Sequence, residues 1–383
     1  MTHRLLIVQP YIPAYRVNLF TQLEERLSAF GVELRVAAPT PKGADRARRD
    51  HVPLGALQIQ VNSKSLGIGS KTLNRRSLRT AILRFDPHFV IVEQAIKNLE
   101  NWEILAGPRN RSHRQVAMWG HGRTYSTHET AIARQAKNWL TNRSDWFFSY
   151  TKEGVTAVTR LGFNPNRITV LRNSIDTQML RRDLESVTQD TLTAFRAEHD
   201  LVPGRTALFL GGLDSRKGIP FLLRSAVLVA EMLPEFKLIV AGSGDMESTV
   251  SKAAMLNRAI VPVGRVDGHR KALMLRAADA LLIPEWVGLV AVDSLVAGVP
   301  IMTTTHCSHS PEFDYLSPGS TCFISPHNEI EYARAVVRQL VDEKQLSTIA
   351  KRCKVESWNY SIENMAENFA NGIRTWKDMA TGM

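Results

Sequence analysis

ADALLIPEWVGLVAVDSLVAGVPIMTTT, residues 278–305, is the stretch that decides the fold. Its LLIP segment predicts a short buried strand, GLVAVDSLVAG predicts a helix that stops at Gly298, and VPIMTTT predicts another buried strand. A strand, a helix and a strand in this order indicate a parallel sheet with helices on its faces. Two acids, Glu285 and Asp293, interrupt the apolar run, one after the first strand and one about a turn into the helix.

The same alternation runs through both halves of the chain. In the first half, RLLIVQP, VELRVAAP, FVIVEQ, VAMWGHG and NRITVLRNSID predict strands, and YRVNLFTQLEERLSAFG predicts a helix. In the second half, TALFLGG and FKLIVAGSG predict strands, whereas IPFLLRSAVLVAEMLP and HRKALMLRAADA predict helices. We therefore expect an α/β protein of two doubly wound, Rossmann-like domains that face a central cleft.

The length and the linker composition set the expected domain boundaries. A chain of 383 residues is long enough for about two domains. The most linker-like segment between the two alternating halves is AEHDLVPGR, which separates a first domain at 1–200 from a second at 201–357. The remaining stretch, 358–383, reads as a long helix that we expect to pack back across the first domain.

Cysteine usage and hydropathy favour a cytoplasmic protein. Cys307, Cys322 and Cys353 form no C-x-x-C pair and are odd in number, so we expect neither a disulfide framework nor a metal site. No apolar run approaches the roughly 20 residues that span a bilayer. The first residues, MTHRLLIVQPYIP, do not have the form of a signal peptide.

The net charge of +11 is unevenly distributed. Residues 1–200 carry 29 Lys and Arg against 18 Asp and Glu, whereas residues 201–383 carry 19 of each. The excess is either a solvated basic face or a surface attracted to an anionic partner, such as a membrane or a nucleic acid. Because the basic stretches lack interleaved aromatic residues, we expect no nucleic acid and a peripheral contact with an anionic membrane.

Glycine-rich segments follow the predicted strands of the second half. GGLDSRKG, residues 211–218, fits neither the Walker pattern nor G-x-G-x-x-G. Lys217 and Arg216 in it are placed to neutralise phosphate charge, or else the segment is a turn in which Asp214 or Ser215 caps a helix. Near Gly288, a helix start offers N–H groups to a diphosphate. The two acids are suited to sugar hydroxyls, or they only complement the helix dipole.

Taken together and in order, these motifs resemble the retaining glycosyltransferases of the GT-B fold, in the large family numbered four. The resemblance rests on FLGGLDSRKG, IVAGSGD, ADALLIPEWVGLVAVDSLVAGVPIMTT and SPEFDYL, and more loosely on WGHG and VLRNSID in the first half. It implies transfer of a sugar from a nucleotide-diphosphate donor to a saccharide or lipid-linked acceptor, with retention at the anomeric carbon. Cell-surface polysaccharide or glycolipid synthesis is the implied setting, at the inner face of the cytoplasmic membrane.

The resemblance also implies roles for individual residues. Glu285 would contact the hydroxyls of the donor sugar, Asp293 the ribose, and Lys217 the diphosphate leaving group, while His121 would face the donor sugar from the first domain. The other donor-binding residues would be Gly211, Gly212, Arg216, Gly264, Arg265, Val266, Gly288, Leu289 and Val290. Tyr15 and Arg16 are candidates for the acceptor, or else they cap the first helix.

The sequence departs from the family pattern at several positions. Gly212 stands where a second diphosphate-binding arginine is usual, Asp293 is a methylene shorter than the usual glutamate, and Trp286 and Val287 replace a usual Gly-Phe pair. No D-x-D motif is present, so we expect no metal cofactor, and catalysis would rest on positive charge at the leaving group. Three alternatives stay open: a nucleotide-sugar hydrolase or epimerase, a catalytically silent relative, and a nucleic-acid-binding protein.

Overall fold

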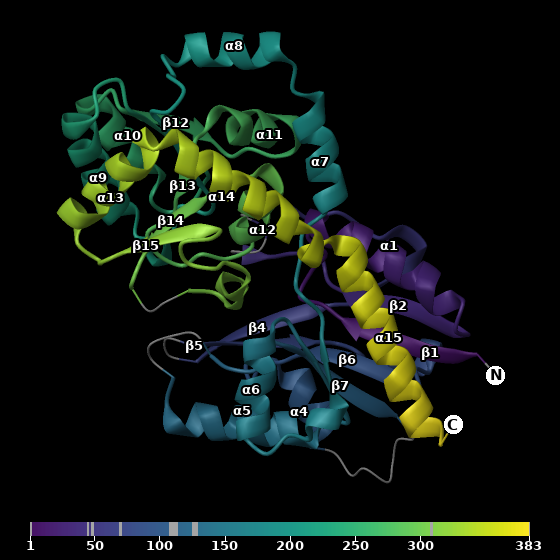
Figure 1. Ribbon diagram of the computed structural model, residues 1–383. Helices are drawn as coiled ribbons and strands as arrows, with labels where there is room; N and C mark the ends of the chain where they lie inside the picture. The colour runs from purple at the N-terminus through teal and green to yellow at the C-terminus, as the bar shows by residue number, and fades with distance from the viewer. Residues whose placement is uncertain are drawn as a thin grey trace. The chain divides into compact units, whose positions relative to one another are not determined.

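The computed structural model describes residues 2–43, 46, 50–68, 71–106, 114–124, 129–306 and 309–382. They form two compact units, drawn in Figure 1. Unit 1 comprises Met1–Asn173 and Ile362–Met383, and unit 2 comprises Ser174–Ser361. Cys307 and most of the basic residues at 44–49 and 107–113 lie outside the described residues, so the predictions made for them stay predictions.

Unit 1 is built on a parallel sheet with the strand order β3-β2-β1-β6-β7-β8-β9 in the part that the structure describes. Its strands are β1 (His3–Val8), β2 (Val32–Ala38), β3 (Gln58–Gln60), β6 (Phe89–Glu93), β7 (Gln115–Gly120), β8 (Trp146–Ser149) and β9 (Ile168–Val170). A separate antiparallel hairpin pairs β4 (Ser63–Ile68) with β5 (Lys71–Arg76). Because β1 lies inside the sheet, the chain winds outward in both directions, which is the doubly wound arrangement.

The described helices of unit 1 are α1 (Ala14–Ser28), α3 (Arg79–Phe85), α4 (Leu99–Leu105), α5 (Ala131–Arg143), α6 (Lys152–Arg160) and α15 (Ile362–Thr381). Helix α15 lies beside α1 (Figure 1) and packs on the sheet of unit 1. The ring centroid of Trp376 is 4.9 Å from that of Phe89, and the ring of Phe369 is 4.7 Å from that of Phe148. This helix, which follows unit 2 in the sequence, is therefore part of the core of unit 1.

Unit 2 repeats the winding with the strand order β12-β11-β10-β13-β14-β15, and all its neighbouring strands are parallel. Its strands are β10 (Thr206–Leu210), β11 (Lys237–Ala241), β12 (Ile260–Gly264), β13 (Ala280–Leu282), β14 (Ile301–Thr304) and β15 (Cys322–Ser325). Its helices are α7 (Thr177–Ser186), α8 (Gln189–Glu198), α9 (Ile219–Met232), α10 (Glu247–Leu256), α11 (Gly268–Ala277), α12 (Val290–Ala297), α13 (Glu329–Val341) and α14 (Glu343–Glu356). The direction of winding reverses between β10 and β13, where such sheets bind ligands.

The boundary between the units falls at Ser174, earlier than the predicted position at residue 201. Helices α7 and α8 pack against α11, and Leu192 and Phe195 of α8 are buried in the core of unit 2. The guanidinium of Arg276 on α11 donates to the carbonyls of Leu184 and Val187, at 3.1 and 3.2 Å. The polar segment that predicts the linker instead connects α8 to β10 inside unit 2.

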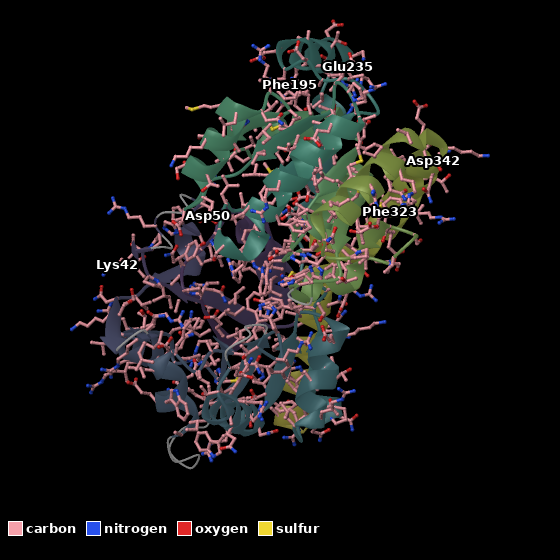
Figure 2. The ribbon with its side chains drawn as sticks, turned by 90° about the vertical axis from the view of Figure 1, so that its left-hand side faces the viewer. Lys42, Asp50, Phe195, Glu235, Phe323 and Asp342 are labelled. Carbon is pink, nitrogen blue, oxygen red and sulfur yellow. The ribbon has the colours of Figure 1, made fainter. Side chains whose placement is uncertain are left out.

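The two edges of the unit 2 sheet differ in what they carry. Figure 2 shows Phe195 of α8 and Glu235, which precedes β11, at one end of unit 2, the edge where the parallel strands begin. A pocket of about 590 Å³ lies there, lined in part by Arg196 and Lys237. It contains none of the predicted donor-binding residues, which follow the carboxyl ends of the strands.

Candidate functional site

Glycine loops after β10, β11 and β12 are joined by backbone hydrogen bonds. The N–H of Gly211 donates to Ala241 O at 3.1 Å, and that of Gly242 donates to Gly264 O at 2.9 Å. A Cβ on Gly242 would lie only 1.9 Å from Gly211 O, so only glycine allows these loops to approach so closely. The predicted donor-binding residues Gly211 and Gly264 therefore lie at one edge of the unit 2 sheet. Arg265 and Val266 directly follow Gly264, and Arg265 is exposed.

Glu285, after β13, lies against Gly218, which precedes α9. Gly218 has a φ of +61°, and a Cβ at this position would be 2.7 Å from the carboxyl carbon of Glu285. The glycine is thus required both by its backbone conformation and by the approach of the acid. Two histidines flank the carboxylate: Nε2 of His327 is 3.6 Å from Oε1 and Nε2 of His306 is 3.9 Å from Oε2.

Lys217 brings a positive charge from the loop after β10 to the loop after β13. Its Nζ donates a hydrogen bond of 2.7 Å to the carbonyl of Trp286, the residue next to Glu285. Burial lowers the pKa of Lys217 to about 8, an effect that the carboxylates of Asp214 and Glu312 oppose and the guanidinium of Arg216 reinforces. The charge therefore lies at the point where the sheet reverses its winding, close to the predicted position of the diphosphate.

Arg216 is paired within its own turn. Its Nε and Nη2 donate to the carboxylate of Asp214 at 3.1 and 2.9 Å, and its guanidinium lies over the ring of Trp286, 5.3 Å from the centroid. Partial burial raises the pKa of Asp214, but hydrogen bonds from the side chain and backbone of Arg216 outweigh it and lower the pKa. Asp214 also caps the turn by accepting from Arg216 N at 3.0 Å, so the capping interpretation of this segment is confirmed and the phosphate-binding one stays a prediction.

Helix α12 starts where the sequence predicts a helix start near Gly288, and phosphate binding there stays a prediction. Helix α12 begins at Val290, and its N-cap, Leu289, makes no side-chain capping hydrogen bond. A Cβ on Gly288 would come no closer than 3.8 Å to a described neighbour, the side chain of Ser310. A Cβ on Gly212 would meet only Asp214 Oδ2, at 3.4 Å. Both glycines are thus free of close contacts at the Cβ position.

Asp293 lies in the first turn of α12 and already has a partner. Its side chain is 11% exposed, and Oδ1 accepts a hydrogen bond of 2.8 Å from Nζ of Lys271 on α11. The sequence does not reveal this ion pair, because the two residues are brought together only by the packing of α11 beside α12. A ribose held by Asp293 would share the carboxylate with Lys271.

Further polar residues of this edge come from the loop after β14. Nδ1 of His309 accepts from Val287 N at 3.2 Å, and its Nε2 lies 3.3 Å from Thr304 O. Burial lowers the pKa of His309. Glu312 is 2% exposed and accepts a hydrogen bond from the hydroxyl of Ser310. The sequence signal for this loop is SPEFDYL, which the family resemblance includes without assigning these roles.

The site residues predicted in the first half belong to unit 1. His121 follows β7, and its ring centroid is 4.5 Å from that of Tyr150. Gln94 secures this loop, because its Oε1 accepts from Gly122 N at 2.9 Å and its Nε2 donates to Thr141 at 2.9 Å. The structure brings predicted donor-binding residues of unit 2 to one edge of its sheet, and their roles, like that of His121 toward the donor sugar, stay predictions.

Tyr15 and Arg16 differ in accessibility. Tyr15 is 38% exposed, whereas Arg16 is 3% exposed, with its guanidinium 2.6 Å from Asn173 Oδ1 and 5.0 Å from the ring centroid of Trp119. Neither caps α1, whose N-cap is Pro13 without a side-chain hydrogen bond. A direct contact between Arg16 and an acceptor would require this packing to open, so Tyr15 is the better candidate.

Two Rossmann-like units with this winding define the GT-B class, and solved structures agree. The chain is similar to HepE of Anabaena in complex with UDP, with 14% identity, a TM-score of 0.70, and coverage of 97% of this chain and 99% of that one. It is also similar to sucrose-phosphate synthase of Thermosynechococcus elongatus, with 15% identity, a TM-score of 0.73 and full coverage of both chains. At such identities the likeness shows the fold.

Family models cover both halves. Residues 193–355 match the model described as Glycosyl transferases group 1, and residues 17–179 match Glycosyltransferase Family 4. Over 106 residues, 26% of this chain, it is 37% identical to the phosphatidyl-myo-inositol mannosyltransferase of Mycobacterium leprae and 33% to that of Mycobacterium tuberculosis. The matched part spans 28% of the length of these relatives. The chain belongs to the group 1 glycosyltransferases of family 4.

Two observations bear on metals and membranes. Among the described residues, no group of His, Cys, Asp and Glu side chains is arranged to hold a metal ion. Within the same residues, none of the helices has the length and apolar character needed to cross a bilayer.

Proposed function

We propose that the protein transfers a sugar from a nucleotide-diphosphate donor to a saccharide or lipid-linked acceptor, with retention of the anomeric configuration. The observation that carries this proposal is the meeting of Lys217 and the Glu285–Trp286 segment between β10 and β13. This arrangement places a cation against the backbone of the segment that carries Glu285, at the ligand-binding edge of a Rossmann-like unit. Membership of the family supports the same activity.

In the proposed mechanism, unit 2 holds the donor and stabilises the departing nucleotide. Lys217 and the amides at the start of α12 would neutralise the charge that develops on the diphosphate, so that no metal cofactor is required. The carboxylate of Glu285 would accept hydrogen bonds from sugar hydroxyls, and Asp293 from the ribose. His121 would contact the sugar from unit 1, and Tyr15 the acceptor.

The names of the similar proteins support the proposed substrates. The HepE structures contain UDP or UDP-glucose, and the mycobacterial relatives are named for the mannosylation of phosphatidyl-myo-inositol. Nucleotide-sugar donors and lipid-linked acceptors therefore both occur among proteins similar to this chain. We infer that the protein acts in the synthesis of cell-surface polysaccharide or glycolipid.

We also propose that unit 1 binds the anionic inner face of the cytoplasmic membrane. Unit 1 carries 28 Lys and Arg against 15 Asp and Glu, whereas unit 2 carries 20 against 22. On α5, Ile132 and Trp139 lie seven residues apart and are 79% and 44% exposed, and the guanidinium of Arg143 lies 4.8 Å from the ring centroid of Trp139, a combination suited to a lipid interface. Liposome sedimentation would test this, and binding that responds to neither anionic lipid nor salt would contradict it.

Titration calorimetry tests the donor site. UDP, GDP and their sugars are titrated into the protein and into Lys217→Ala, and we expect one nucleotide family to bind and to lose affinity in the variant. Product analysis with and without an acceptor then separates transfer from hydrolysis or epimerisation. Binding without any turnover would instead identify a silent relative, the alternative that the pairing of Arg216 with Asp214 and the absence of an arginine at Gly212 favour.

A further inference from the structure

A pocket of about 540 Å³ opens beside Glu285, on the side of α9 and α13. Its lining includes Gly218, Phe221, Arg224, Glu285, His327 and Asn328. The volume lies in the range of roughly 300–1,000 Å³ that is usual for small-molecule sites. The motifs of the family place Glu285 in this region but assign nothing to His327.

The hydrogen bonds around Thr304 fix the proton of His327. The hydroxyl of Thr304 donates its single proton to Pro284 O, at 2.8 Å. Its oxygen therefore has to accept from Nδ1 of His327, which lies 3.0 Å away. In neutral His327 the proton is thus on Nδ1, and Nε2 is a bare acceptor directed toward Oε1 of Glu285 at 3.6 Å.

The imidazole is held firmly in this orientation. Its ring stacks on that of Phe221, with centroids 4.4 Å apart and planes 12° from parallel. His306 covers it with a centroid distance of 4.6 Å, and Phe221 is supported in turn by the ring of buried Tyr332. The edge with Nε2 is what the ring presents to the pocket.

With His327 neutral, its Nε2 and the carboxylate of Glu285 are two acceptors side by side, and a ligand that binds to both has to supply the donors. Two neighbouring hydroxyls of one sugar ring meet this need, because one can donate to the carboxylate and the other to the imidazole nitrogen. The pocket also disfavours an anionic ligand. Arg224 is already bonded to Glu329 at 2.7 Å, and the carboxylate of Glu285 repels negative charge.

We propose that His327 is a specificity-determining residue of the donor site, and that with Glu285 it selects a neutral sugar by accepting hydrogen bonds from two adjacent hydroxyls. The inference rests on the proposed function and deepens it, since it names the class of sugar and the residue that reads it.

The experiment compares the wild-type protein, His327→Phe and His327→Gln on UDP-glucose, GDP-mannose and analogues that each lack one sugar hydroxyl. Phenylalanine keeps the stacking on Phe221 but removes the acceptor, and glutamine supplies an amide oxygen in its place. His199→Phe is the matched control, because His199 also packs on a phenylalanine, Phe195, at 4.8 Å, and lies outside the pocket. Binding of UDP and GDP without a sugar reports whether each variant has kept its nucleotide site.

For the complete sugar, we expect His327→Phe to lower kcat/KM by roughly tenfold to a hundredfold, with His327→Gln partly restored and His199→Phe unchanged. In the wild-type protein, one deoxy analogue should have a kcat/KM lower than that of the complete sugar by the same factor. In His327→Phe, the absence of that hydroxyl should cause no further loss of kcat/KM. An equal loss on every analogue, or no loss at all, overturns the inference while the proposed function stands. If the wild-type protein binds and transfers no nucleotide sugar, the proposed function fails and the inference fails with it.

Discussion

The two units share one winding order but differ where their first strands end. In unit 2 the loop after β10 contains Gly211 and Gly212, Lys217 reaches the carbonyl of Trp286, and a pocket lies beside Glu285. In unit 1 the corresponding loop after β1 contributes Tyr11 and Ile12, which are 4% and 0% exposed. The order of strands determines which loops meet, and the volume of the loop side chains determines whether a ligand-sized space is left within a unit.

Each unit also has a cation at this edge, with a different environment. Lys217, in the glycine-rich loop after β10, donates a hydrogen bond to the carbonyl of Trp286 in the loop after β13. Arg16 is enclosed by Trp119, Tyr150 and Asn173. We therefore predict that the lysine serves binding and that the arginine serves the fold.

The strongest test of the comparison removes the charge in unit 2. We expect Lys217→Ala to lower kcat/KM by about a hundredfold to a thousandfold, as loss of a preorganised group at a developing negative charge does. Arg216→Ala should lower it less than tenfold, because its guanidinium is bonded to Asp214 and 58% exposed. Steady-state kinetics on both variants measures the difference. Equal losses of kcat/KM would show that Arg216 binds the diphosphate as strongly as Lys217 does.

The next test adds one methyl group to the loop between β10 and α9. Gly218→Ala should displace the carboxylate of Glu285 and lower kcat/KM by about a hundredfold, because the new Cβ would lie 2.7 Å from it. Gly204→Ala is the matched control: Gly204 also has a positive φ, +79°, but its nearest neighbour would be 3.9 Å away. The control should lose about 1 kcal/mol of unfolding free energy and keep its activity.

The enclosed cation of unit 1 is tested by stability. Arg16→Leu should lower the free energy of unfolding by about 2 kcal/mol, through loss of the hydrogen bond to Asn173 and of the contacts with aromatic rings. Arg26→Leu, a change at a partly exposed position of the same helix, should stay within about 0.5 kcal/mol. Denaturant unfolding measures both values. A neutral Arg16→Leu would mean that the buried arginine is kept for binding.

The pH dependence of nucleotide binding sharpens the assignment of Lys217. The lysine binds a diphosphate in its protonated form, and its pKa of about 8 means that the protonated fraction falls as the pH rises through 8. Affinity for the nucleoside diphosphate should therefore fall by about fivefold between pH 8 and pH 9, as the protonated fraction falls from about one half to about one eleventh. Calorimetry across this range gives the profile, and Lys217→Arg, which stays charged, should give a flat one.

The smallest expected effect is a gain. Gly212→Arg should tighten nucleotide binding by about threefold to tenfold, because it adds a cation near the predicted diphosphate. The backbone at Gly212 is not in the left-handed region, and a Cβ there meets only Asp214 Oδ2, at 3.4 Å. Gly212→Ala should leave the affinity unchanged. Unchanged affinity in the arginine variant would indicate that the diphosphate does not lie near the loop after β10.

Local patterns made the grouping of the predicted donor-binding residues visible in the sequence. Glu285, Lys217 and the glycines lie in loops that follow strongly apolar strands, and parallel strands bring their carboxyl ends to one edge. The histidines after β14 and β15 and the Asp293–Lys271 pair escaped prediction, because only tertiary packing makes them neighbours. The predicted boundary was wrong for a related reason: the burial of α7 and α8, and not the composition of the next loop, determines their unit.

The place of α15 has a consequence for how the protein is made. Unit 2 emerges from the ribosome before α15, yet Phe369 and Trp376 of α15 complete the core of unit 1. Domains usually fold in the order of their synthesis. Here the first 173 residues expose the apolar surface that α15 covers until unit 2 and then α15 have been synthesised. The nascent protein thus passes through a stage at which its second unit can be finished and its first cannot, and this stage is when it is most exposed to aggregation or to chaperones.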